Sequence, residues 1–192
     1  MVTVQAPARR YTIDDLAHFP DDGKLRELVD GQIVEWDMPG WQHGLFETEL
    51  ASILRNFVRE RHLGLVASGE VMSRIRGSIH SARGSDIEFR RRGRIPRDDA
   101  DAPATLTVPD LVVEIVSPSD RADLVLEKIY DWLRAGVQLL WYIDPKTGNT
   151  TVYQGDRVWH VAAEEPLDGG EVLPGFQIRL RDVLAGLSEE LE

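Results

Sequence analysis

The sequence contains no cysteine among its 192 residues, which excludes disulfide bonds and thiolate metal sites. It also has no long hydrophobic run, since apolar stretches such as LVV and LLWYI are far too short to span a bilayer. The opening residues, MVTVQAPARRYT, lack the long apolar region of a signal peptide. We therefore expect a cytoplasmic protein with no membrane partner.

Positive charge is scarce as well, because 22 Lys and Arg face 33 Asp and Glu and give a net charge of -11. Nucleic-acid binding through bulk attraction needs clustered Lys and Arg, so this balance argues against that mode. An enzyme can still gather acids in one cleft with basic residues beside it. The length and the 42% hydrophobic content are typical of one globular domain, residues 1–192, of which residues 1–10 are expected to be flexible.

Periodicity and turn residues predict an alternation of helices and strands. Asp30-Gly31 predicts a type I′ hairpin, Ser119 or Asp120 is expected to cap a helix, and Gly64 and Gly136 are expected to end helices. The order predicts an α/β (α+β) fold with a mixed central sheet flanked by helices. Helices are predicted at residues 12–18, 41–63, 121–135 and 181–185, and strands at 24–36 (the hairpin), 64–68, 70–76, 85–89, 109–116, 138–144, 150–154 and 157–161.

Two acids stand in the apolar stretch VPDLVVEIVSPSD, residues 108–120. An extended strand rises roughly 3.3 Å per residue, so the Cα atoms of Asp110 and Glu114 lie about 13 Å apart. Two carboxylates that share one hard cation must converge within a few ångströms, because its oxygen ligands lie at roughly 2.0–2.6 Å. Glu114 therefore needs an acid from another strand. Asp110 is expected to end the loop or to hydrogen-bond backbone groups there.

Apolar neighbours on both faces of the strand indicate that Glu114 is buried. A buried carboxylate without a partner is costly, so a structural ion pair is as good an interpretation as a catalytic role. The candidate partner strand is SDIEF, residues 85–89, where Asp86 is favoured because Glu88 lies nearer the following arginines. From the alternation alone, Asp86 is more simply an exposed strand acid than a ligand.

Three further side chains have both a functional and an ordinary interpretation. Lys128 lies on a helical stripe with Leu124 and Trp132, where it could reach over the sheet or simply extend to solvent along the apolar face. His43 and Glu47, one helical turn apart, could edge a cleft or form a surface pair. The sequence has no His-Glu-x-x-His zinc motif, no Gly-rich phosphate loop and no Gly-x-Ser-x-Gly.

The motifs occur in a characteristic order: a Leu-Val-Asp-Gly hairpin, a His-bearing helix, an acidic strand, PDLVVEIVSPS, a helix with Lys and Tyr, and AGVQLLWYIDP. This order resembles the Uma-type family of restriction-endonuclease-like proteins, within the PD-(D/E)XK nuclease superfamily. The resemblance covers about residues 11–185 and is most specific over residues 109–145. It implies a restriction-endonuclease-like core with an additional N-terminal hairpin and C-terminal strands.

The resemblance also assigns roles to residues. Asp86 corresponds to the first metal-binding acid and Glu114 to the second. Val116 occupies the usual place of the superfamily lysine, and Lys128 matches the lysine that this family supplies from the following helix. His43 and Glu27 match positions near the site. Ser85-Asp86 replaces the usual Pro-Asp, and the visible Pro109-Asp110 belongs to another motif position.

The implied chemistry is hydrolysis of a phosphodiester bond. Asp86, Glu114 and the backbone carbonyl of Ile115 would hold Mg²⁺ or Mn²⁺, which polarises the phosphate and lowers the pKa of a bound water. Lys128 would orient that water or stabilise charge developing on phosphorus. Glu47 or His43 would support the ligands. The arginines that follow Asp86 are phosphate-contact candidates, although an exposed hairpin tip is the simpler interpretation: Arg90, Arg91, Arg92 and Arg94.

The leading hypothesis is thus a metal-dependent endonuclease acting on nucleic acid, with DNA as the expected substrate. A homodimer is a reasonable expectation, since two sites facing opposite strands would cut both. Two alternatives remain. The acidic net charge favours a non-catalytic nucleic-acid or protein interaction module that keeps the fold. A metal-dependent hydrolase of small phosphoesters would use the same acids and lysine.

Overall fold

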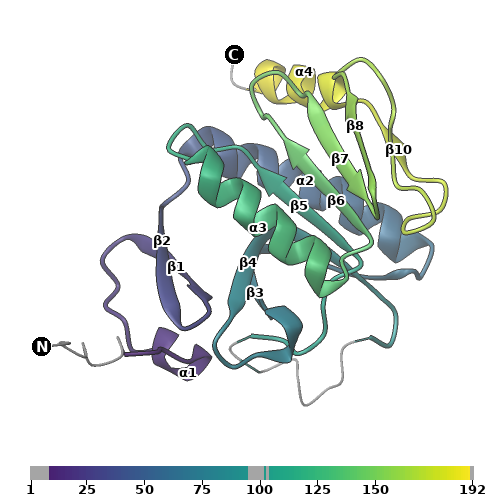
Figure 1. The fold of residues 1–192 in the computed structure, drawn as a ribbon. Helices are drawn as coiled ribbons and strands as arrows, with labels where there is room; N and C mark the ends of the chain where they lie inside the picture. Colours follow the sequence, from purple (N-terminus) through teal and green to yellow (C-terminus); the bar gives the residue numbers. More distant parts are fainter. Residues whose placement is uncertain (1–8, 95–101, 103, 191–192) are drawn as a thin grey trace, which may run out of the picture.

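The structure, a computed structural model, describes residues 9–94, 102 and 104–190, so most of residues 1–10 and much of the loop after Arg94 lie outside the described residues. Figure 1 shows the arrangement of its elements. In chain order these are α1 (Ile13–Leu16), β1 (Lys24–Val29), β2 (Gln32–Asp37), α2 (Trp41–Glu60), β3 (Gly64–Arg74), the 3₁₀ turn η1 (Ile75–Gly77), β4 (Ala82–Arg91), β5 (Leu111–Ile115), α3 (Ala122–Ala135), β6 (Leu139–Ile143), β7 (Thr150–Gln154), β8 (Arg157–Val161), β9 (Leu167–Asp168), β10 (Gln177–Ile178) and α4 (Leu180–Glu190).

Eight strands form one mixed sheet in the order β2-β1-β4-β5-β6-β7-β8, with β3 paired to β4 off this path. Only β5 and β6 pair in parallel among these strands, and α3 makes the crossover between them. The other pairs are antiparallel. The predicted mixed sheet flanked by helices is confirmed. Its central strands, β4 and β5, carry the candidate acids.

Helices cover both faces of the sheet (Figure 1). The apolar side of α2 packs with α4 against one face, where Phe46 and Leu50 meet Ile87 and Val113. On the other face, α3 packs against residues such as Val112. Since neighbouring residues of a strand face opposite sides, β5 is buried on both, as its apolar run predicts.

Turn and cap residues explain several boundaries. Asp30 and Gly31 have positive φ values of 49° and 82°, as a type I′ turn requires, and they join β1 to β2. Thr12 and Asp15 form a capping box at α1. Gly136 ends α3 with φ 104°.

Other boundaries differ from the predictions. Gly64 does not end α2, which stops at Glu60; it begins β3, where an added Cβ would lie 2.0 Å from the carbonyl oxygen of Arg90. The two strands predicted at residues 64–68 and 70–76 are one strand with a bulge. Arg121 is the N-cap of α3 and makes no side-chain capping hydrogen bond, because the Asp120 carboxylate binds the backbone N–H of Ser117 instead. The last helix, α4, is longer than predicted.

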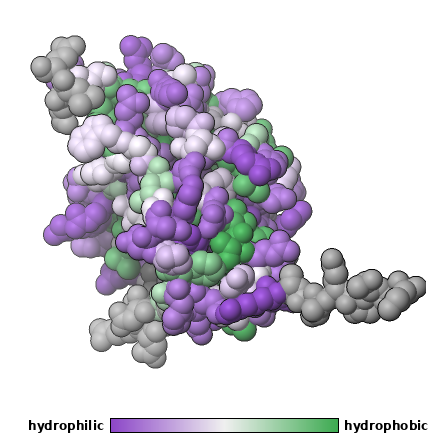
Figure 2. Space-filling model, turned by 90° about the vertical axis from the view of Figure 1, so that its left-hand side faces the viewer, coloured by the Kyte–Doolittle hydropathy of each residue, from purple (hydrophilic) through white to green (hydrophobic). Residues whose placement is uncertain are grey.

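Among the described residues, no helix is both long enough and apolar enough to cross a membrane. Figure 2 shows the side of the molecule that carries the β1–β2 hairpin. Hydrophilic side chains cover most of this side, and hydrophobic ones gather in smaller patches between them. The surface around the hairpin is therefore mainly polar.

Candidate active site

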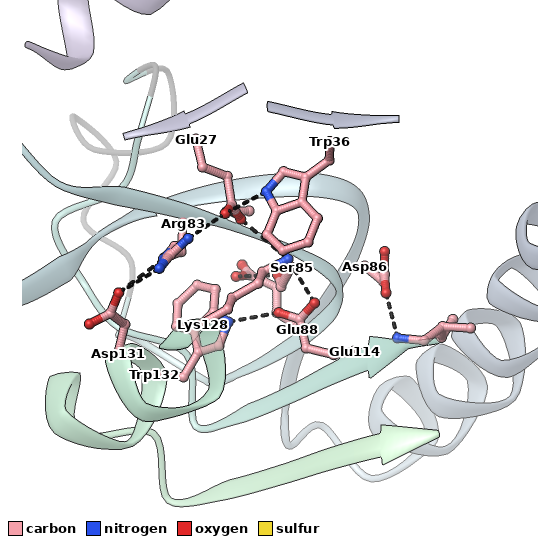
Figure 3. Close-up of polar contacts among 12 residues, drawn as sticks. Glu27, Trp36, Arg83, Ser85, Asp86, Glu88, Glu114, Lys128, Asp131 and Trp132 are labelled. Carbon is pink, nitrogen blue, oxygen red and sulfur yellow. Dashed lines mark hydrogen bonds and ion pairs between the residues drawn. The ribbon is translucent and has the colours of Figure 1, made fainter. Parts of the chain in front are cut away.

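Pairing between β4 and β5 ends where the two acids stand. The last pair toward this end is Ile87 opposite Val113, so the same register would place Asp86 opposite Glu114. Directly opposed residues have Cβ atoms about 5 Å apart. Instead of pairing, Asp86 accepts a hydrogen bond from the backbone N–H of Ile115 through Oδ2, at 2.6 Å (Figure 3). The two acids thus lie at an opening between adjacent strands.

Glu114 faces α3, in keeping with the alternation of β5. Its Oε1 accepts a hydrogen bond from Trp132 Nε1 at 2.7 Å, and its Oε2 lies 2.8 Å from Lys128 Nζ. Glu114 is 6% exposed and Lys128 8%. The buried ion pair that the sequence left open is therefore present, and its partner is the candidate catalytic lysine.

Lys128 also touches the N-terminal hairpin. Its Nζ lies 3.2 Å from Glu27 Oε1 and 5.5 Å from the centre of the Trp36 ring. Figure 3 shows Lys128 between Glu27 on one side and Glu114 on the other. Its ammonium group does not extend along the apolar face to solvent, as the ordinary interpretation had it. It is held in place by carboxylates from two strands.

Glu27 has a full set of partners. Its Oε2 accepts hydrogen bonds from Trp36 Nε1 and Arg83 Nη1, both at 2.8 Å, and its Oε1 accepts one from the backbone N–H of Gly84 at 2.9 Å. Arg83 also pairs with Asp131 on α3 at 2.8 Å. These bonds fix the hairpin to β4 and α3, so that Glu27 holds Lys128 from a rigid position.

His43, near the start of α2, approaches the same place from the other side of the sheet. Its Nε2 lies 3.2 Å from the backbone oxygen of Ile115 and 3.6 Å from Asp86 Oδ1. Its buried Nδ1 has no hydrogen-bond partner and lies 3.8 Å from Glu47 Oε2. His43, Glu47 and Asp86 each offer a ligand atom within 4.8 Å of the others. An unpartnered imidazole nitrogen among carboxylates is a donor set that suits a divalent cation.

Burial and charge shift the pKa values of these groups. Burial opposes the charge of Lys128, but Glu114 and Glu27 outweigh it and raise the pKa of the ammonium well above its usual value. Burial raises the pKa of Glu114 well above its usual range, and the charges of Asp86 and Glu70 add to this against the effect of Lys128. Burial would also raise the pKa of Asp86, yet contact with His43 and the charge of Lys128 lower it.

Burial and neighbouring charges also shift the pKa values of His43 and Glu47. Burial lowers the pKa of its imidazole, but the hydrogen bond with Asp86 and the charges of Asp86 and Glu47 outweigh this and raise it. Burial raises the pKa of Glu47, and the nearby charge of Asp86 raises it further. Acids outnumber positive charges at this position, an arrangement that favours an added cation.

One cavity brings the candidate residues together. Asp86, Glu114, Lys128, His43 and Ile115 all line it. Five other polar residues also line it, and the sequence predicted none of them as a site residue: Asp37, Glu70, Ser117, Asp120 and Tyr142. The pKa of Tyr142 is raised to about 12, chiefly by burial and by the charge of Asp120. In the sequence, the predicted turn after the strand of Glu114 was the signal that could have indicated Asp120 as a site residue. For Glu70 the signal was the predicted break between strands at Gly69.

The arginines after Asp86 do not share one environment. Arg90 is 1% exposed and pairs with Glu88 at 2.6 Å, so its guanidinium faces the interior. Arg91 donates to the backbone oxygen of Glu171 at 3.1 Å. Arg92 is exposed and lines a separate pocket with Arg55, Arg59 and His62. Arg92 lies about 20 Å along the strand from Asp86, since each residue rises roughly 3.3 Å.

Asp110 lies outside the cavity. It is fully buried, and its Oδ2 accepts a hydrogen bond from the backbone N–H of Arg91 at 2.8 Å. Its Oδ1 pairs with Arg94 Nη1 at 2.9 Å. Asp110 therefore holds the turn after β4 in place, as its distance from Glu114 along the strand predicts.

A model of the Uma2 family, described as "Putative restriction endonuclease", matches residues 13–181. The chain belongs to the Uma2 family. The resemblance drawn from the motifs is thereby confirmed, and the match covers nearly the whole described chain. No curated protein sequence matches it.

A solved structure supports the fold of this family member. It is a crystal structure of a putative nuclease belonging to DUF820 from Anabaena variabilis ATCC 29413, and it is 22% identical in sequence. The match covers 92% of this chain and 98% of that chain, with a TM-score of 0.78. At this identity the likeness concerns the fold, which is shared over almost the full length of both.

Proposed function

We propose that the protein is a metal-dependent endonuclease that hydrolyses phosphodiester bonds of nucleic acid, with DNA as its substrate. The observation that carries this proposal is the position of Asp86, Glu114 and Lys128. They come from β4, β5 and α3, and they line one cavity in a chain of a restriction-endonuclease-like family. A fold alone does not establish an activity, so the weight rests on these three side chains.

Asp86, Glu114 and the backbone carbonyl of Ile115 would hold Mg²⁺ or Mn²⁺, with His43 and Glu47 beside them. Hard divalent cations prefer oxygen ligands, which four of these five groups supply. The surplus of buried acids and the unpartnered Nδ1 of His43 fit such an ion. When bound, the ion would polarise the phosphate and lower the pKa of the attacking water.

The side chains have complementary roles in this proposal. The Lys128 ammonium is kept charged by Glu114 and Glu27, and it would orient the attacking water or stabilise negative charge on the phosphate in the transition state. Glu27 positions Lys128 without reaching the substrate itself. His43, with Nε2 toward Asp86 and Ile115, would keep the Asp86 carboxylate in place.

The remaining expectations complete the proposal. A single domain in the cytoplasm that acts as a homodimer could cut both strands of DNA. Of the arginines after Asp86, Arg92 is the best placed to contact a distant phosphate, because it is exposed and lies among Arg55, Arg59 and His62. Phosphate contacts position a nucleic acid without reading its sequence.

Plasmid cleavage with Mg²⁺ or Mn²⁺ tests the activity. We expect the wild type to nick or linearise the plasmid, and Asp86→Asn, Glu114→Gln and Lys128→Met to lose at least about 10²-fold in rate, because each removes a group that acts on the reacting phosphate. Glu127→Gln is the matched control, since Glu127 is exposed and adjacent to Lys128 in sequence. Its rate should equal that of the wild type.

Equal residual cleavage by all variants would point to a contaminating nuclease and contradict the assignment. Cleavage of small phosphoesters but not of plasmid would favour the small-substrate hydrolase. Absence of both cleavage and Mn²⁺ binding in the wild type would favour an interaction module, which the acidic net charge of -11 also suits.

A further inference from the structure

A bulge in β3 lies directly opposite Asp86. Along the β3–β4 pair, Ser68 faces Ile87 and Val71 faces Ser85, so two residues of β3, Gly69 and Glu70, stand against Asp86 alone. Such a bulge re-aims a side chain and recurs next to active sites. Here the residue that it re-aims is an acid.

The backbone at this bulge is specialised. Gly69 has φ 91° and Glu70 has φ 58°, and a positive φ is uncommon for a residue with a side chain. Glu47, on α2, accepts a hydrogen bond from the backbone N–H of Gly69 at 2.9 Å. The helix that carries His43 therefore also holds the bulge in position.

The carboxylate of Glu70 lies in space that a neighbouring glycine leaves free. A Cβ added at Gly84 would stand only 2.7 Å from Glu70 Oε2, too close for any real Cβ contact. The backbone N–H of Gly84 meanwhile binds Glu27. The side-chain space of Gly84 is thus filled by Glu70, and its backbone supports the acid that holds Lys128.

Glu70 lines the same cavity as Asp86 and Glu114, and it faces the charge of Lys128. Its carboxyl contacts that of Asp86 without a dedicated Arg or Lys of its own among the described ion pairs. His43 provides an independent sign of a missing ligand beside Asp86, because its Nδ1 is buried and unpartnered at 3.8 Å from Glu47 Oε2, its side chain is 7% exposed, and the residue lines this cavity.

We propose that Glu70 is a third carboxylate ligand of the metal site, and that with Asp86 and Glu114 it binds a divalent cation such as Mn²⁺ or Mg²⁺. This role rests on the proposed metal-dependent function and extends it to a residue of another strand. Three carboxylates around one ion satisfy the preference of hard cations for charged oxygen ligands. The bulge and Gly84 are the structural features that bring the third one in.

Calorimetric titration of the full chain with Mn²⁺, without nucleic acid, tests the ligand directly. We expect Glu70→Gln to weaken Mn²⁺ binding about 10- to 100-fold while the secondary structure, followed by circular dichroism, stays unchanged. Gly84→Ala is the second variant: it leaves the charge of Glu70 intact but displaces its carboxylate. It should weaken binding to a similar extent, which separates ligand position from charge alone.

Asp86→Asn and Glu127→Gln complete the comparison, the first as a ligand variant and the second as an exposed control. Loss of affinity in Asp86→Asn together with wild-type affinity in Glu70→Gln would overturn the role of Glu70 and leave the metal-dependent function standing. A folded wild type that binds no Mn²⁺ would overturn both. Weak binding in Glu70→Gln and Gly84→Ala, with wild-type binding in Glu127→Gln, is the supporting result.

Discussion

Two buried charge clusters extend from β4, and they are balanced differently. The Arg90 cluster consists of Arg90, Glu88, Ser73 and Thr107. It pairs one cation with one acid, and every nitrogen of the guanidinium has a partner: Nε and Nη2 bind Glu88, Nη2 also binds Ser73, and Nη1 binds Thr107. The charges of this cluster are balanced, and the hydrogen-bonding capacity of its guanidinium group is satisfied.

The Lys128 cluster consists of Lys128, Glu27, Glu114, Asp86 and Glu70. Four acids act on one ammonium group; Glu27 also has Arg83 against it and Asp86 has the imidazole of His43, whereas Glu114 and Glu70 have no second cation among the described ion pairs. Such a surplus of buried acid is unfavourable in a structural network, because each unbalanced charge is desolvated without compensation. The comparison indicates that burial of charge does not by itself mark a functional site, whereas an unbalanced cluster in a cavity does.

The largest effect is expected from breaking the balanced cluster. Arg90→Met should lower the free energy of unfolding by about 3–5 kcal/mol, because it leaves Glu88 buried without a cation. Urea denaturation measures this, with and without Mn²⁺. Arg92→Met, at an exposed neighbour, should change the stability by less than about 0.5 kcal/mol. Equal stability of the two variants would show that the Arg90 cluster is not structural.

The second-largest expected effect is stabilisation by a metal ion, which should depend on the Lys128 cluster and not on the Arg90 cluster. Mn²⁺ at about 100 times its dissociation constant should stabilise the wild type by about 2.7 kcal/mol, since a ligand that binds only the folded state shifts the equilibrium by mass action. Thermal melts in Mn²⁺ and in EDTA measure the difference. Glu114→Gln should abolish this stabilisation. A metal effect that survives in Glu114→Gln would place the ion elsewhere.

The smallest effect concerns pH. Burial and the charges of Asp86 and Glu27 raise the pKa of Glu70 to about 8, although the charge of Lys128 acts to lower it. Between pH 4.5, the ordinary pKa of a glutamate, and pH 8, the metal-free folded state therefore keeps a proton on Glu70 that the unfolded state releases. Stability from this group is full below pH 4.5 and is lost as the pH rises to 8. We expect a loss on the order of 1–2 kcal/mol in EDTA, because one pKa unit corresponds to about 1.4 kcal/mol and partial exposure screens the shift.

Glu70→Gln should flatten the curve over that range, and denaturation midpoints at pH 5, 6, 7 and 8 measure it. Asp123→Asn is a suitable control because Asp123 is exposed on α3. A wild-type stability that rises between pH 5 and 8 in EDTA would contradict the assignment of this shift to Glu70.

The elements could be predicted because their signals are local. Asp30-Gly31 determines a turn with two positive φ values, and the apolar run around Glu114 determines a strand buried on both faces. The exclusion of Asp110 needed only the rise of a strand. The cap of α3 could not be predicted, because Asp120 can bind either its own helix or the preceding turn, and tertiary structure selects the bond to Ser117.

The site could be predicted only in part, for a related reason. Glu114 and Lys128 stand out as charged residues among apolar ones, and the family resemblance linked them to Asp86. Glu70 is marked only by the preceding Gly69, since its acid sits among both polar and apolar residues of the sequence. Its direction depends on a bulge that appears only when β3 is paired against β4. Arg90 likewise reads as part of a basic turn until its pairing with Glu88 is known.

Ile115 meets the site through its main chain. Its N–H is held by Asp86 and its C=O by His43, so both functional groups belong to the backbone and neither belongs to the side chain. The side chain serves the core and is free to change to any apolar residue that fills the same space. Residue 115 can therefore be substituted by another apolar residue while its backbone contribution to the site stays the same. A comparison of side chains alone would overlook this backbone group, which is one of the closest to the proposed chemistry.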